Sequence, residues 1–171
     1  MTRLTDTGHD GPYEAPLQLV GEHVRPEWID YNGHMNVAYY TLAFDHAIDR
    51  LLEDHLGIGE THVREARQGP YALQAHVHYL DELLEGDPFT FTALLIDCDH
   101  KRMHLFLEMR KADGSVAATM EEMLMNVDLE ARRSVPYPDW AQARMARMKE
   151  AHAAVPRPVQ VARPLGIGRK G

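Results

Sequence analysis

The stretch Trp28-Ile29-Asp30-Tyr31-Asn32-Gly33-His34-Met35-Asn36 is the best guide to the architecture of this chain. It contains a carboxylate, an imidazole, two carboxamides and two aromatic rings on a turn that includes glycine. From Val37 to Leu56, apolar residues recur at steps of three and four, which predicts a long helix with Asn36 as its N-cap and Gly57 at its end. The first N–H groups of a helix lack partners, so this loop would place acid–base groups beside donors for a carbonyl oxygen. Acyl transfer requires that combination.

The composition is that of an ordinary soluble globular protein. Its length of 171 residues favours one domain with a sizeable core. There are 26 acidic and 18 basic residues, a net charge of -8, so we expect no nucleic-acid partner. The single Cys98 excludes a disulfide framework and fits a reducing compartment. No apolar leader or membrane-length apolar run is present, so we expect a cytoplasmic protein that does not bind a membrane.

Five segments have the alternating or apolar pattern of β-strands. The first covers residues 17–25, ahead of the long helix, and the others cover 71–79, 89–98, 103–109 and 116–129. Ala112-Asp113-Gly114 is a hairpin turn with glycine where a left-handed residue is needed. Short helices are expected within 58–69 and over 139–154. The domain proper is then 16–154, with residues 1–15 as a flexible lead-in and 155–171 as a tail rich in Pro, Arg and Gly.

The order of these elements predicts an α+β protein. Short turns make three of the last four strands consecutive antiparallel partners. A sheet with one apolar face needs a cover, and the long helix is the one candidate. Burial of Tyr40, Phe44, Ile48 and Leu51 would contribute on the order of 1.5–3 kcal/mol each before conformational entropy is counted. One long helix wrapped by a five-stranded antiparallel sheet is the hotdog fold.

The segment from Asp30 to Tyr40 resembles the signature loop and helix start of the hotdog-fold acyl-CoA thioesterases related to 4-hydroxybenzoyl-CoA thioesterase. Residues 79–87 look like the strand and turn that precede the long hairpin of that family, and the whole resemblance covers roughly residues 17–130. It implies a thioester hydrolase that converts an acyl-CoA to the free acid and CoA without a cofactor. Within the family, residues 73–80, 99–104 and 121–128 look most similar to the betainyl-CoA thioesterase subgroup. The implied substrate is betainyl-CoA, from carnitine breakdown, with another short or aromatic acyl group as the alternative.

The resemblance also implies roles for the loop. Asp30 matches the catalytic carboxylate, which acts as general base on water or attacks the thioester directly. The amide of Val37 matches the donor that polarises the thioester carbonyl. Asn32 and His34 would position water or tune Asp30. The plainer alternative is that Asn32 and Gly33 only form a turn and that Asn36 only caps the helix.

Aromatic and imidazole groups near the loop are candidates for the acyl pocket. Aromatic faces and carboxylates hold a quaternary ammonium group, at roughly 0.5–2 kcal/mol per cation–π contact. The candidate substrate-binding residues are Trp28, Tyr31, Asn36, Tyr39, Tyr71, His76 and His78. If Trp28 packs beside the first strand, only Tyr31 and Tyr39 remain for the pocket, and such aromatic enrichment also suits phenyl or alkyl groups.

Two histidines, two basic residues and a methionine-rich stretch outside the loop are also candidates for specific roles. His76 and His78 share one face of a strand, but no cysteine pair or helical His–Glu spacing supports a metal, so none is expected. A polar face or a subunit interface is their plainer role. Lys101 and Arg102, in a hairpin turn, are candidates for the CoA phosphates, with a solvated surface as the alternative. The stretch that contains Met120, Met123 and Met125 is predicted to fill the core.

The spacing of Asp30 and His34 and the absence of an output element count against two other functional classes, a hotdog hydratase and a non-catalytic acyl-CoA-binding module. Hotdog hydratases carry an imidazole five positions after the carboxylate with a proline between, whereas Asp30 and His34 are four apart without one. A non-catalytic acyl-CoA-binding module would need an output element, and no DNA-reading helix pair is visible. Exposed sheet edges invite pairing, and the resemblance implies a homodimer or dimer of dimers with sites at the interface.

Overall fold

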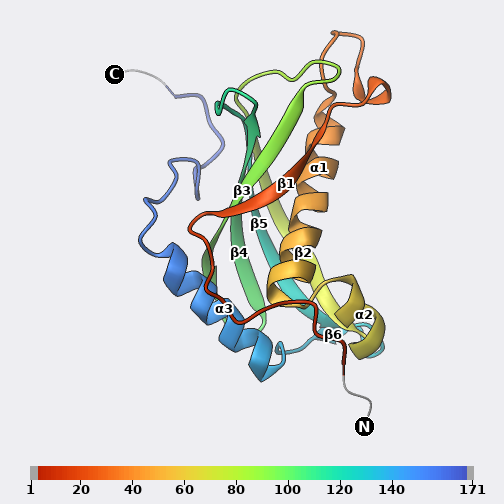
Figure 1. The fold of residues 1–171 in the computed structure, drawn as a ribbon, viewed down its shortest axis with the longest axis vertical. Coiled ribbons are helices and arrows are strands. Elements are labelled where there is room, and N and C mark those ends of the chain that lie inside the picture. Colours follow the sequence, from red (N-terminus) through yellow and green to blue (C-terminus); the bar gives the residue numbers. More distant parts are fainter. Residues whose placement is uncertain (1–3, 169–171) are drawn as a thin grey trace.

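A curved antiparallel sheet wraps one long helix in the computed structural model, which describes residues 4–168 (Figure 1). Figure 1 shows α1 lying along the sheet and α3 beside one end of it. The elements in chain order are β1 (Leu17–His23), the 3-10 helix η1 (Pro26–Trp28), α1 (Val37–Arg50), the π-helical η2 (Leu51–Leu56), α2 (Glu60–Ala66), β2 (Gln68–Tyr79), β3 (Pro88–Cys98), β4 (Arg102–Lys111), β5 (Val116–Asp128), β6 (Arg133–Ser134) and α3 (Asp139–His152).

The long helix begins and ends where its capping residues predict. The side chain of Asn36 accepts a hydrogen bond from the N–H of Ala38 at 3.0 Å, which caps α1. The last turn widens into η2, where the N–H of Gly57 bonds to the carbonyl of Leu52. Gly57 then ends the helical run with a φ of 72°, a conformation that favours glycine.

The sheet has the strand order β1-β3-β4-β5-β2, with the short β6 added beside β5. The three consecutive antiparallel partners predicted from the turns are β3, β4 and β5, and Gly114 occupies the left-handed position of the last turn. The predicted α+β hotdog architecture is confirmed, with β6 as a sixth strand that the alternation did not reveal. Because β2 pairs with β5, it ends the sheet and leaves one side of its backbone without a strand among the described residues.

The core lies between α1 and the inner face of the sheet. Tyr40, Phe44, Ile48 and Leu51 are all buried, as the helical spacing predicted. Side chains alternate along β5, so Met120 packs in this core while Met123 and Met125 lie half-buried on the outer face. The prediction of core filling is therefore right for Met120 and wrong for the other two.

The helix α3 closes the part of the sheet that β1 does not reach. Its buried His152 accepts a hydrogen bond from the N–H of Leu95 on β3 at 2.8 Å, where a further strand would otherwise pair. Buried Arg144 of α3 bonds to the carboxylates of Asp6 and Asp10 and to the carbonyl of Leu56. Residues 4–15, predicted as a flexible lead-in, thus lie against α3 and η2, while the predicted domain boundaries stay a prediction.

The segment after α3 returns across the outer face of the sheet. The N–H of Ala162 donates to both carboxylate oxygens of Glu121, at 3.0 and 2.9 Å. Val161 beside it is buried. Over the described part of the chain, no helix combines the length and the apolar character needed to cross a membrane.

Candidate active site

The loop of residues 28–36 is held as a tight turn ahead of α1. The N–H of Asn36 bonds to the carbonyl of Trp28 at 2.9 Å, and the N–H of Asp30 bonds to the carbonyl of His34 at 3.0 Å. Gly33 takes a φ of 83° at the turn. The N–H of Met35 bonds to the carbonyl of Leu83 at 2.8 Å, which ties the loop to the segment after β2. These bonds fix the approach of the loop to the helix N-terminus.

Asp30 lies half-buried at the start of this turn. Its carboxylate accepts a hydrogen bond from the N–H of Asn32 at 2.8 Å. That bond uses one oxygen, and among the described residues the other has no partner, so it is free to accept a proton or attack a carbonyl carbon. The side chain of Asn32 is exposed.

A cleft of about 260 Å³ lies at the N-terminus of α1. Two of the predicted catalytic residues line it: His34 and Val37. Within residues 4–168 the N–H of Val37 has no hydrogen-bond partner, so it remains available as a donor. His34 Nδ1 lies 3.2 Å from the carbonyl of Met35, and donation there leaves Nε2 as an acceptor. Asp30 and Asn32 do not line this cleft.

The opposite wall of the cleft comes from the end of β2 and the residues after it, a segment that the sequence analysis matched to the family but did not assign to the site. Buried Tyr40 holds this wall, because its hydroxyl accepts from the N–H of Leu83 at 3.2 Å and donates to the carbonyl of Asp81 at 3.4 Å. Burial raises the pKa of Tyr40, so the ring stays neutral. Tyr79, Leu80, Asp81 and Glu82 complete the wall.

The aromatic side chains of the loop lie in different surroundings within the protomer. Trp28 is 2% exposed and stacks on Tyr39 with ring centroids 5.4 Å apart, under the guanidinium of Arg25. Tyr31 is 97% exposed. The ring of Trp28 therefore faces protein, Tyr31 faces solvent, and neither lines the cleft beside Val37. Their substrate-binding role stays a prediction.

Three further candidates lie on the edge strand β2. His76 and His78 point to the outer face of the sheet, opposite Glu121 and Thr119 of β5. His76 lines an outer cleft of about 300 Å³ that also contains the hydrogen-bonded pair His104 and Glu121, 2.7 Å apart. Tyr71 is half-exposed at the other end of the strand. Among the described residues, no cluster of three or more His, Cys, Asp or Glu side chains has the arrangement of a metal site.

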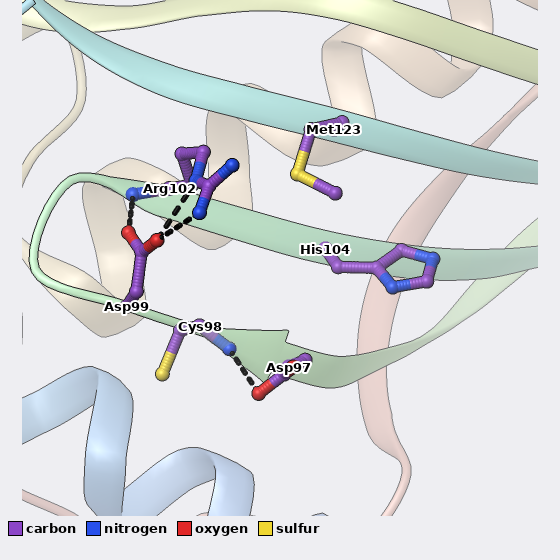
Figure 2. Close-up of a pocket in the computed structure, with 6 residues that line it drawn as sticks. All are labelled: Asp97, Cys98, Asp99, Arg102, His104 and Met123. Atoms are coloured by element: carbon purple, nitrogen blue, oxygen red, sulfur yellow. Dashed lines mark hydrogen bonds and ion pairs between the residues drawn. The ribbon is translucent and has the colours of Figure 1, made fainter.

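Lys101 lies in the turn between β3 and β4, and Arg102 is the first residue of β4. Figure 2 shows Arg102 turned towards Asp99, with Nη2 and Oδ2 2.6 Å apart. Partial burial would raise the pKa of Asp99, but hydrogen bonds from Arg102 and from the backbone lower it to about 2. Lys101 Nζ lies 3.3 Å from Ser134 Oγ. Arg102 is level with Met125 of β5, so within one protomer this turn lies at the end of the sheet away from the cleft beside Val37.

Residues 24–145 match the family model of the thioesterase-like superfamily. The chain belongs to this superfamily. A betainyl-CoA thioesterase of Pseudomonas aeruginosa is 34% identical over 156 residues, which cover 91% of this chain and 93% of that protein. An L-carnitine dehydrogenase/betainyl-CoA thioesterase of Rhizobium meliloti is 36% identical, over 91% of this chain and 31% of the longer relative.

A solved structure agrees with this membership. A Staphylococcus aureus protein in complex with CoA superposes with a TM-score of 0.83 at 30% identity, over 92% of this chain and 100% of that one. The predicted family, hotdog fold and thioester hydrolase class are therefore confirmed.

Sequence reasoning missed one titratable group of this thioesterase-like protein, Glu122. It lies on the inner face of β5 at 8% exposure, and burial together with the charge of Asp45 raises its pKa to about 7. The signal was present in the pair Glu121-Glu122, because adjacent residues of a strand face opposite sides and one of the two must face the core.

Proposed function

We propose that this chain is an acyl-CoA thioesterase that hydrolyses betainyl-CoA to glycine betaine and CoA. The observation that carries the proposal is the N–H of Val37, which has no partner among the described residues and belongs to a residue that lines a cleft at a helix N-terminus, directly after the Asp30 turn. The relatives with betainyl-CoA thioesterase in their names support the acyl group, and the relative solved with CoA supports a CoA thioester. Hydrolysis of another short or aromatic acyl-CoA is the alternative.

The proposed chemistry uses the groups of the loop. The N–H of Val37 donates to the thioester oxygen and stabilises the negative charge that develops on it. Asp30 either removes a proton from a water molecule that attacks the carbonyl carbon, or attacks that carbon itself to give a mixed anhydride that water then hydrolyses. In both routes the C–S bond breaks, and the CoA thiolate leaves and takes up a proton. Asn32 and His34 position the water.

The proposed assembly is a homodimer, alone or within a dimer of dimers, formed through β2. This strand has one unpaired side, and its Tyr71, Leu73 and Tyr79 are 44%, 52% and 50% exposed. Unpaired edges with exposed apolar side chains favour pairing with another strand. A two-fold axis pairs β2 with its copy in antiparallel fashion and keeps both α1 helices on the same face of the combined sheet.

That pairing would bring together candidates that one protomer keeps apart. Val37 lies near Tyr79 and Leu52 lies near Pro70, so α1 runs antiparallel to β2. An antiparallel copy therefore places the Tyr71 end of one protomer beside the helix N-terminus of its partner. The turn with Lys101 and Arg102 lies at that same end, which supports its proposed role with the CoA phosphates. We place the enzyme in the cytoplasm, where CoA thioesters are made and used.

The test is release of free CoA from a panel of thioesters: betainyl-CoA, its uncharged isostere 3,3-dimethylbutyryl-CoA, acetyl-CoA and a phenylacyl-CoA. We expect turnover with a preference for betainyl-CoA over the isostere of about tenfold or more. No free thiol from any thioester would overturn the thioesterase proposal. Equal hydrolysis of betainyl-CoA and the isostere would overturn only the acyl assignment.

A further inference from the structure

Glu122 lines a cavity of about 300 Å³ between α1, α2 and the strands β2 and β5. Within residues 4–168 its carboxylate has no hydrogen bond and no ion pair, although the residue is more than nine-tenths buried. Buried carboxylates are almost always paired, so an unpaired one facing a cavity indicates a missing positive partner.

The cavity is acidic and otherwise apolar. Asp45, Asp49 and Glu60 line it together with Glu122, and no lysine or arginine does. The remaining walls are mainly aliphatic: Ile48, Leu52, Val63, Pro70, Ala72 and Leu124. Such a site provides negative potential for a cation and apolar contact for the carbon atoms around it.

These walls suit an organic cation better than a metal ion. A divalent ion needs several oxygen ligands that converge within about 2.0–2.6 Å. The four carboxylates come from α1, α2 and β5, and over the described chain no three of them have the arrangement of a metal site. A quaternary ammonium cannot donate hydrogen bonds and spreads its charge over methyl groups, so it requires negative charge nearby and apolar surface in contact.

We propose that this cavity binds the quaternary ammonium group of the acyl chain, with Glu122 as its principal counter-charge and Asp45 and Asp49 at the rim. The inference rests on the proposed function, whose acyl specificity it explains. In the proposed site, carboxylates and aliphatic side chains hold the cation, in place of the aromatic side chains expected from the sequence.

The distance between this cavity and the Val37 N–H fits a betainyl group only if the cavity and the N–H belong to different protomers of the proposed dimer. Within one protomer, Asp45 is eight residues along α1 from Val37, about 12 Å at the helical rise. In a betainyl group, however, only two bonds separate the carbonyl carbon from the nitrogen. The antiparallel pairing of β2 brings the Asp45 and Asp49 part of one helix towards the N-terminus of the other. The cation would then lie in the cavity of one protomer while its carbonyl meets the partner's donor.

The protonation state of Glu122 provides a second test of whether this cavity binds the cation. Burial and the charge of Asp45 keep this carboxyl protonated up to about pH 7 in the empty site, and the titratable groups that line the cavity with it are Asp45, Asp49 and Glu60. A bound cation stabilises the carboxylate and so lowers its pKa. We therefore expect the preference for betainyl-CoA over the isostere to weaken as pH falls below 7.

The experiment compares kcat/KM for betainyl-CoA and 3,3-dimethylbutyryl-CoA in the wild type, in Glu122→Gln and in Glu150→Gln. Glu150 is an exposed residue of α3, so its substitution removes one negative charge away from the cavity. We expect Glu122→Gln to lose about tenfold or more on betainyl-CoA, to keep its rate on the isostere within about twofold, and Glu150→Gln to match the wild type on both.

Three outcomes would overturn the inference. If Glu122→Gln keeps the wild-type preference, Glu122 does not recognise the cation, and the thioesterase proposal stands. If it loses both substrates equally while remaining folded by circular dichroism, Glu122 serves catalysis or assembly instead. If it does not fold, the pH profile of the wild-type preference decides, and a preference for betainyl-CoA that does not weaken below pH 7 has the same meaning as the first outcome. A wild type without any preference would instead remove the betainyl assignment itself.

Discussion

Removal of the Glu122 carboxylate should stabilise the fold at neutral and alkaline pH. The ordinary pKa of the group is 4.5 and the folded protein raises it to about 7, principally by burial and also through Asp45. Each pKa unit corresponds to about 1.36 kcal/mol, so the ionised carboxylate lowers the free energy of unfolding by about 3 kcal/mol. The contribution of the protonated group is fully present below pH 4.5 and is lost as pH rises through 7. Glu122→Gln cannot ionise and avoids the loss.

The assay is urea unfolding of wild type, Glu122→Gln and Glu150→Gln at pH 4.5, 6 and 8, at one protein concentration. We expect the wild type and Glu122→Gln to coincide at pH 4.5, within about 0.5 kcal/mol, and Glu122→Gln to be more stable by up to about 3 kcal/mol at pH 8. Glu150→Gln controls for loss of one charge on an exposed surface. A Glu122→Gln variant that is less stable than the wild type at pH 8 would refute the reasoning, because it would mean that the carboxylate is paired.

Asp30→Asn should keep fold and substrate affinity but retain less than about a tenth of the wild-type turnover; a rate above that limit would exclude Asp30 as base or nucleophile. Asn36→Ala removes the acceptor for the N–H of Ala38, so thermal unfolding should report a loss of about 1 kcal/mol, and an unchanged midpoint would contradict the capping role. Leu73→Lys on the edge strand should convert dimers to monomers in sedimentation at micromolar concentration and abolish CoA release, and a wild type that sediments as a monomer would argue against the interface.

The fold was largely predictable because its signals are local. Asn36 and Gly57 mark the two ends of the helical run by backbone chemistry that acts over a few residues. The alternation along β3, β4 and β5 likewise needs only neighbouring residues to be recognised. The place of α3 depends on contacts between distant segments, such as the bond between His152 and the N–H of Leu95, which no local pattern encodes. The short strand β6 is local but has only two residues, Arg133 and Ser134, too few for an alternating pattern to be recognised.

The site was predictable only in part, for a related reason. His34 and Val37 follow the turn directly, and the structure brings them to one cleft. The burial of Trp28 and the distance of Arg102 from that cleft depend on the packing of whole elements. Glu122 was overlooked because it stands in a methionine-rich run that predicted core filling. The inward position of a carboxylate becomes visible only when the faces of the strand are assigned.

The two edges of the sheet differ in whether another strand can pair with them. At the β1 border, Arg50 donates to the carbonyl of Val20 at 2.9 Å, and further along His152 takes the N–H of Leu95, so side chains already occupy groups that an incoming strand would need. The β2 border has no such obstruction among the described residues. A chain open at both borders can add copies without limit and form filaments. A chain open at one border has no edge left after it binds its first partner, so the proposed pairing through β2 would end the sheet with two copies.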